Sequence, residues 1–98
     1  MLTTIVSNLQ GQTHLYQQYG MNYVALFGSY ARSEEQSNSD VDVMVDFDEP
    51  KSFFELADLQ FSLEKALGQK VDLVIKNSVK KNLLSYIHED IIPIYEKS

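Results

Sequence analysis

The sequence predicts an α/β domain in which helices flank a small mixed β-sheet. Two segments, Asp40–Phe47 and Val71–Ile75, alternate between apolar and other residues, as strands with one buried face do. Between them, Ser52-x-x-Glu55 is a capping box ahead of a helical apolar stripe that ends at Gly68. A helix that joins two strands of one sheet makes a right-handed crossover, so we expect these two strands to be parallel. The stripe consists of Leu56, Leu59, Leu63, Ala66 and Leu67.

The first part of the chain gives shorter patterns. Residues 4–19 predict a first helix, with apolar side chains near helical spacing and Gly20 as its stop. Residues 23–27 are an apolar run that ends at Gly28, which predicts a buried strand. The stretch between this strand and Asp40 has room for one short helical piece. If the two strands are antiparallel, Gly28 and Asp40 lie at the same end of the sheet.

The last part of the chain completes the sheet. Residues 78–90 predict a final helix capped by Ser78, with Val79, Leu83 and Ile87 facing inward. The tail Pro93-Ile94-Tyr95 predicts a short edge strand, a position where proline is tolerated.

Composition and charge exclude several classes of protein. The 98 residues contain no repeat or linker and predict one domain, residues 1–98. The lack of cysteine excludes disulfide scaffolds, zinc ribbons and thiol catalysis. Fourteen acidic against eight basic residues give a net charge of −6, which argues against direct nucleic-acid binding, because a phosphate backbone requires a basic footprint. No export signal and no run near the ~20 apolar residues of a membrane span is visible, so we expect a cytoplasmic protein without a membrane partner.

Five residues carry the candidate chemistry. Asp40 and Asp42, at positions i and i+2 of one strand, project from the same face roughly 6–7 Å apart. Carboxylates at that separation can share Mg²⁺, and Asp72 supplies a third carboxylate in the same apolar frame. Gly28-Ser29 offers backbone N–H groups and a hydroxyl to a phosphate. Asp-x-Asp alone is usually a solvated strand face, and the acidic cluster of residues 40–49 is either that or a cation site. The combined pattern favours the site.

The spacing Gly28-Ser29-x10-Asp40-x-Asp42 resembles the signature of the DNA polymerase β-type nucleotidyltransferase superfamily. The stretches 28–32 and 39–45 resemble its minimal nucleotidyltransferase (MNT) branch, short prokaryotic proteins encoded beside a HEPN-domain partner. The resemblance covers essentially the whole chain and implies the polymerase β-like palm fold. Where the family often has glycine after an Ala-Arg pair, this chain has Ser33, which fits unless φ there must be positive.

The resemblance implies a role for each site residue. Asp40 and Asp42 are expected to hold two Mg²⁺ ions, and Asp72 to complete the shell of the catalytic ion and activate the acceptor hydroxyl. Ser29, with the backbone around Gly28, is expected to bind the β- and γ-phosphates of ATP. Attack on the α-phosphate then releases pyrophosphate.

Two basic residues leave alternatives open. Arg32 either reaches a nucleotide phosphate or ties the loop to Glu34 or Glu35, and the structural role is slightly favoured. Lys76, at the end of the Asp72 strand, is either a phosphate contact or a surface lysine, and the surface position is favoured.

By this resemblance the chain is expected to be the antitoxin of a HEPN–MNT toxin–antitoxin pair. It would transfer AMP from ATP to a tyrosine of its HEPN ribonuclease toxin and would form a hetero-oligomer with it. The alternatives are an antitoxin that acts by binding alone and a nucleotidyltransferase that acts on a small molecule. RNA tailing is least favoured, because a basic groove is missing.

Overall fold

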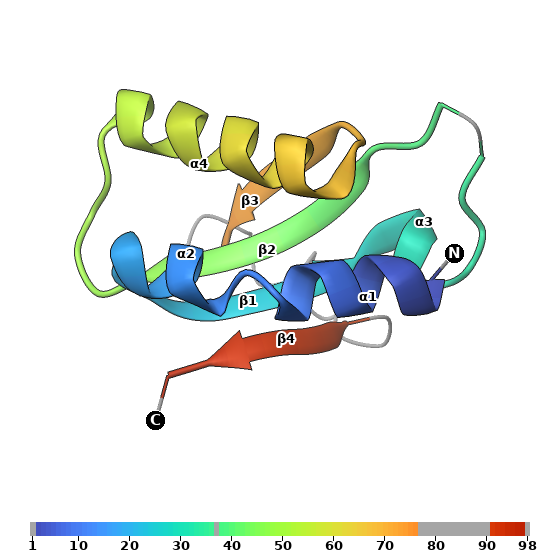
Figure 1. Cartoon of the computed structure of the whole chain (residues 1–98), viewed down its shortest axis with the longest axis horizontal. Helices are drawn as coiled ribbons and strands as arrows, with labels where there is room; N and C mark the ends of the chain where they lie inside the picture. Colours follow the sequence, from blue (N-terminus) through green and yellow to red (C-terminus); the bar gives the residue numbers. More distant parts are fainter. Residues whose placement is uncertain (1, 37, 77–90, 98) are drawn as a thin grey trace.

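The fold is a four-stranded mixed sheet with helices on one face, seen in a computed structural model that describes residues 2–36, 38–76 and 91–97. Figure 1 shows α1, α2 and α4 on the same side of the sheet. This confirms the predicted α/β class. In chain order the elements are α1 (Leu2–Gln10), α2 (Thr13–Gln18), β1 (Met21–Phe27), α3 (Gly28–Ala31), β2 (Val41–Phe47), α4 (Phe53–Leu67), β3 (Val71–Ile75) and β4 (Ile92–Glu96).

The strand order is β3-β2-β1-β4. β2 and β3 are parallel, as predicted from the helix between them, and β1 is antiparallel to both β2 and β4. The predicted tail strand is β4, and it lies at the edge beside β1. In the antiparallel pair Phe27 lies opposite Asp42, so the end of β1 meets the start of β2. This register brings the Gly28-Ser29 turn to the acidic strand.

The single first helix predicted over residues 4–19 is wrong, because the chain forms two helices there. The break follows Gly11, whose N–H still donates to the carbonyl of Ser7 at 3.0 Å. Glycine within a helix costs about 1 kcal/mol relative to alanine, which makes this the weak point. The break allows the buried Tyr16 of α2 to fold back, and its hydroxyl donates to the carbonyl of Leu9 at 2.6 Å.

The main core lies between the sheet and the helices. Its centre consists of the apolar face of β2, Val41, Val43 and Val45, packed with residues of α1 and α4. On α4 the predicted stripe is correct for Leu59, Leu63 and Leu67, which are buried, and wrong for Ala66, which is exposed. On the opposite face of β2, Met44 is also fully buried and lies beside Ala25 of β1. That face is therefore apolar in the middle and acidic at its ends.

Two further expectations from the sequence concern the final helix and the lack of a membrane span. The predicted final helix, residues 78–90, lies outside the described residues. Among the helices that the structure describes, none has the length and apolar character that crossing a bilayer requires.

The capping box predicted at the start of α4 is present and gives a test of stability. The Ser52 hydroxyl accepts from the N–H of Glu55 at 3.2 Å, and the Glu55 carboxylate accepts from the N–H of Ser52 at 3.3 Å. We expect Ser52→Ala to lower the free energy of unfolding by about 1 kcal/mol, measured by urea denaturation. Ser62→Ala, in the middle of the same helix, is the control and should not destabilise. Equal stability of Ser52→Ala and wild type would refute the capping role.

Candidate active site

The contact between Gly28 and Asp42 is the centre of the candidate site. Gly28 follows β1 directly and has a φ of +77°, in the left-handed region that side chains rarely adopt. A Cβ atom at this position would collide with the Asp42 carboxylate, whose Cγ would lie 3.0 Å away. Only glycine meets both requirements. The carboxylate therefore lies directly against the backbone of the turn, which is why the sequence needs Gly28 at the end of this strand.

Asp42 and Asp72 lie on neighbouring parallel strands in direct register. The start of β3 is fixed by α4: Gln60 Nε2 donates to the carbonyl of Val71 at 3.0 Å, and the N–H of Val71 donates to the Glu64 carboxylate at 3.0 Å. Two side chains of one helix thus set the position of the residue that precedes Asp72.

Asp42 lies in a negative environment that the Arg32 guanidinium compensates only in part. Asp42 is half-buried, whereas Asp40 and Asp72 are exposed. Burial raises the pKa of Asp42 above its ordinary value, and the carboxylates of Asp72 and Asp40 raise it further, while the Arg32 guanidinium partly offsets them. A cation at this position would relieve the repulsion.

The side chains at this site are of the type that binds Mg²⁺, but too few of the described ones gather to enclose an ion by themselves. Carboxylate oxygens are the ligands that this hard cation prefers, and Mg²⁺ usually takes one or two of them together with waters and substrate phosphates. Within residues 2–36, 38–76 and 91–97, no three His, Cys, Asp or Glu side chains gather closely enough to hold one ion among themselves. Asp40 directly precedes β2 and Asp42 lies on it, and Asp72 is beside Asp42 without completing a three-ligand group. The geometry suits an ion that a phosphate ligand completes.

The loop after Gly28 is folded by its own hydrogen bonds. The carbonyl of Ser29 accepts from the N–H of Glu34 at 2.8 Å. Arg32 Nε forms an ion pair with the Glu34 carboxylate at 3.3 Å, which is the structural role that the sequence favoured for this residue. Arg32 is partly exposed, and its charge also acts on Asp42.

Lys76 lies away from this centre. Its Nζ is 4.3 Å from the centre of the Tyr23 ring, a cation–π contact, at the opposite end of β3 from Asp72. Lys76 is four positions beyond Asp72 along the chain, roughly 13 Å at the rise of a strand. The sequence favoured a surface lysine here; Lys76 is half-buried against Tyr23, and a phosphate contact stays a prediction that nothing in the described part of the chain supports at this position.

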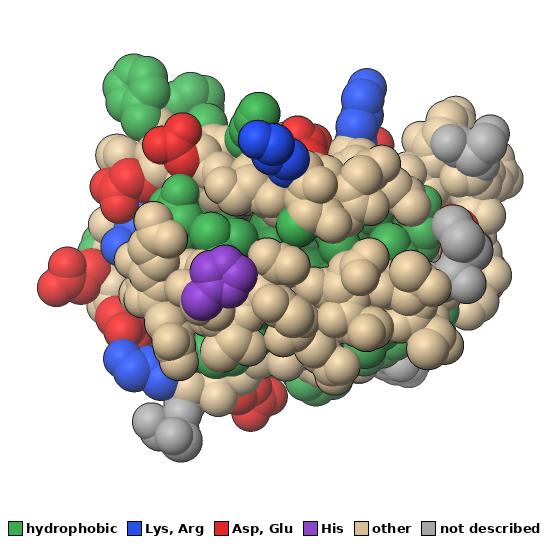
Figure 2. Space-filling model, in the orientation of Figure 1, with side chains coloured by type: hydrophobic (Ala, Val, Ile, Leu, Met, Phe, Trp, Pro, Cys, Tyr) green, Lys and Arg blue, Asp and Glu red, His purple; other side chains and the backbone are tan. Residues whose placement is uncertain are grey.

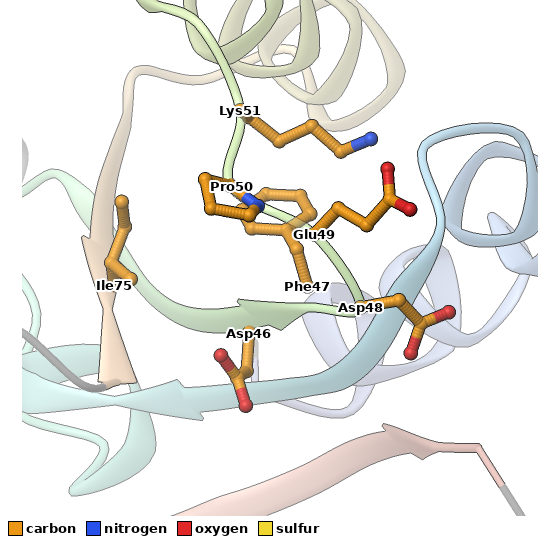
Figure 3. A pocket seen from close by; sticks show the side chains of 7 residues that line it. All are labelled: Asp46, Phe47, Asp48, Glu49, Pro50, Lys51 and Ile75. Atoms are coloured by element: carbon orange, nitrogen blue, oxygen red, sulfur yellow. The ribbon is translucent and has the colours of Figure 1, made fainter.

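The hollow shown in Figure 3 is also away from the centre, at the turn between β2 and α4. Its volume is about 400 Å³. One of its acidic residues, Asp48, is paired with Lys97 at 2.7 Å. None of the predicted site residues lines it; it is formed by Asp46, Phe47, Asp48, Glu49, Pro50, Lys51 and Ile75.

Sequence reasoning missed one link in the site. The ring of Tyr30, directly after Ser29, is buried, and its hydroxyl donates to the side-chain oxygen of Gln69. This bond joins the turn after β1 to the turn before β3, 39 residues further along the chain. A large aromatic residue inside a polar turn was the available signal, but nothing in the spacing identified Gln69 as its partner.

Comparison with known proteins agrees with this geometry. The model of the family described as "Polymerase beta, Nucleotidyltransferase" matches residues 12–98. The protein adenylyltransferase MntA of Thermococcus cleftensis is 37% identical over 78 residues, which are 80% of this chain and 79% of that protein. A solved structure described as a candidate minimal nucleotidyltransferase is 32% identical with a TM-score of 0.80, and the match covers 94% of each chain.

A third similarity concerns the fold alone. The MNT antitoxin structure solved in complex with a tri-AMPylated HEPN toxin of Shewanella oneidensis has a TM-score of 0.70. It is 21% identical, and the match covers 99% of this chain and 74% of that one.

Ser33 gives a stability prediction. It is in the left-handed region, with a φ of +58°, so the turn does require the positive φ at which glycine is favoured. A non-glycine residue there costs about 1–2 kcal/mol, and the extra flexibility of unfolded glycine offsets roughly half of this. We expect Ser33→Gly to stabilise by about 0.5–1 kcal/mol and to raise the melting temperature by a few degrees. Ser62→Gly, within α4, is the control and should destabilise; a lower melting temperature for Ser33→Gly would contradict the strain.

Asp42 gives a prediction with a definite sign in pH. Its folded-state pKa is raised, so the folded form binds the proton more tightly than the unfolded one. Its charge therefore destabilises the fold at neutral pH, and that cost disappears as the pH falls through the raised pKa. We expect Asp42→Asn to melt higher than wild type at neutral pH in a chelator, with a smaller difference in acid. Mg²⁺ should raise the melting temperature of wild type more than that of the variant.

The control for this experiment is Asp46→Asn, which changes the same residue type at the other end of β2. It should keep the Mg²⁺ response of wild type. A variant Asp42→Asn that is less stable than wild type at neutral pH without cation would contradict the electrostatic account.

Proposed function

The chain belongs to the polymerase β nucleotidyltransferase family, and we propose that it is an antitoxin that transfers AMP from ATP to a tyrosine of a cognate HEPN ribonuclease toxin. It would act as one minimal nucleotidyltransferase domain, residues 1–98, in the cytoplasm. The observation that carries the proposal is the packing of the Asp42 carboxylate against the backbone of the Gly28 turn. That contact places groups suited to a phosphate and to a cation side by side, in a chain similar to a protein adenylyltransferase.

In the proposed reaction each site residue has a separate task. Gly28 and Ser29 bind the β- and γ-phosphates through backbone N–H groups and the hydroxyl, which orients the leaving group. Asp40 and Asp42 are the residues that would hold two Mg²⁺ ions. When bound, these ions neutralise charge on the attacking and leaving oxygens of an in-line displacement. Asp72, in register with Asp42, accepts the proton of the acceptor hydroxyl.

The bonds balance as a simple substitution at phosphorus. The tyrosine oxygen forms a bond to the α-phosphorus, and the bond from that phosphorus to the bridging oxygen of pyrophosphate breaks. The proton of the tyrosine passes to Asp72 and then to solvent. Arg32 stays with Glu34 in this scheme and serves nucleotide binding by holding the loop that carries Ser29.

The surface of α4 supports a protein as the acceptor. Phe53 and Phe54 are 78% exposed and Phe61 is 56% exposed. Figure 2 shows apolar side chains protruding where α4 begins. Exposed aromatic residues are typical of protein interfaces, and the acidic net charge suits a basic ribonuclease partner. The proposal includes a hetero-oligomer with the toxin and no direct contact with nucleic acid.

The same exposed surface favours a second candidate, an antitoxin that neutralises by binding alone. The two candidates differ only in whether neutralisation of the toxin requires the carboxylates of Asp40 and Asp42. Neutralisation by an Asp40→Ala/Asp42→Ala double variant would favour binding alone, and loss of neutralisation with intact toxin binding would favour transfer.

The direct test is transfer in vitro. We expect the protein with ATP, Mg²⁺ and the HEPN protein encoded beside it to add AMP to that protein, seen by intact mass, and peptide mapping to locate the AMP on tyrosine. Loss of one metal carboxylate costs about 3 kcal/mol or more of transition-state stabilisation, so Asp42→Asn should reduce the rate by at least about a hundredfold. Asp46→Asn is the matched control on the same strand. Near-wild-type transfer by Asp42→Asn would refute the site.

A further inference from the structure

A polar hollow of about 380 Å³ opens beside Asp40, at the same end of the sheet as the Gly28 turn. It differs from the hollow at the other end of β2 because it adjoins one of the predicted site carboxylates. Two segments far apart in the sequence form it, the loop before β2 and the turn before β3. The residues that line it are Asn38, Ser39, Asp40, Gly68, Gln69 and Lys70.

The walls of this hollow are held in place by hydrogen bonds on both sides. On one wall, the side chain of Gln69 accepts from the buried Tyr30 hydroxyl, and the carbonyl of Lys70 accepts from the N–H of Val41 at 2.8 Å. On the other, Ser39 Oγ accepts from the N–H of Gln36 at 2.8 Å, and the N–H of Ser39 donates to the carbonyl of Gln36 at 3.0 Å. These bonds hold the described backbone of both walls.

Lys70 is the one cationic residue among those that line the hollow. It is exposed, and in the described part of the chain it forms no ion pair. Arg32, the other basic side chain near the carboxylates, is already paired with Glu34. Within the described residues, Lys70 is thus a cationic residue without an ion pair in the lining of a hollow that also includes Asp40.

The strand order places the hollow opposite the Gly28 turn. Gly28 follows β1 and Lys70 precedes β3, and these two strands flank β2 on opposite sides. A ligand that touches both must pass over the carboxylates at the start of β2. An extended ligand with several negative charges that also binds cations would suit this placement, and a phosphate-bearing substrate has these properties.

We propose that this hollow is an anion subsite of the active site and that Lys70 binds a phosphate group in it. The phosphate belongs either to the donor nucleotide or to a nucleotide already attached to the acceptor when transfer repeats. The proposal rests on the proposed function and adds to it a residue that the signature of glycine, serine and aspartates does not include. Gln69, held by Tyr30, is a positioning residue that fixes the backbone from which Lys70 extends.

The test uses two variants and one control. Lys70→Met removes the charge and keeps most of the side-chain length, and Lys70→Arg restores a cation. Lys65→Met, an exposed lysine whose Nζ lies 5.8 Å from the Phe61 ring centre on α4, removes the same charge elsewhere. Net charge is then the same in Lys70→Met and in the control.

Two measurements separate the sources of the phosphate. Calorimetry on the isolated chain measures the affinity for tripolyphosphate and for ATP with Mg²⁺, and needs no acceptor. Intact mass measures the rate of the first and of each later AMP transfer to the HEPN protein. For loss of a charge-assisted hydrogen bond at an exposed site we expect about a tenfold effect.

Each outcome has a defined meaning. Tenfold weaker tripolyphosphate and ATP binding by Lys70→Met, rescued by Lys70→Arg, assigns the subsite to the donor nucleotide. Unchanged binding with only the later transfers slowed assigns it to a nucleotide on the acceptor. Lys70→Met equal to Lys65→Met in both measurements overturns the subsite. If wild type transfers nothing, the proposed function fails separately, and unchanged tripolyphosphate affinity in Lys70→Met then overturns the subsite by itself.

Discussion

The close packing of one carboxylate against one glycine is the constraint on which the rest of the candidate site depends. The turn after β1 can approach β2 because Gly28 has no side chain, and it can leave the strand because Gly28 adopts a positive φ. The antiparallel register puts Asp42 opposite Phe27, the last residue of β1. Any larger residue at position 28 would separate the turn from the carboxylate and open the site.

The cost of this arrangement is electrostatic and is partly balanced by the fold around it. Asp42 is half-buried beside two other carboxylates, so its charged form is disfavoured, a cost that a bound cation would relieve. The apolar opposite face of β2 and the side chains of α4 that bind Val71 supply the stability that holds these strands in place. The protein thus keeps a locally unfavourable charge cluster on a well-packed sheet, as sites for cations commonly do.

Local patterns in the sequence were sufficient for β2, α4 and the parallel pairing of β2 with β3. The alternation of valine and aspartate identified β2, the capping box and Gly68 bounded α4, and the connection between β2 and β3 required a parallel pair. The break at Gly11 was not predicted, because the gain from folding Tyr16 back onto Leu9 is a tertiary effect. The exposure of Ala66 likewise depends on how α4 is rotated against the sheet, which spacing alone does not determine.

The site was predictable where it depends on strands and unpredictable where it depends on loops. The antiparallel pairing of β1 and β2, which the sequence left as a condition, brings Gly28 at the end of β1 against Asp42 of β2. The hollow with Lys70, and the positive φ of Ser33, arise from turns whose conformations come from contacts distant in sequence. Their residue types are ordinary for exposed loops, so composition carries no signal for them.

The bond from Tyr30 to Gln69 has a consequence for self-modification. An enzyme proposed to label tyrosines carries one directly after Ser29, next to the nucleotide that would be bound there. The Tyr30 side chain is only 3% exposed and its hydroxyl is engaged by Gln69, so its oxygen cannot approach a bound α-phosphate as an acceptor. Tyr16 is equally inaccessible as an acceptor, because it is fully buried and its hydroxyl donates to the Leu9 carbonyl. The fold thereby keeps these two internal nucleophiles from competing with the acceptor supplied from outside.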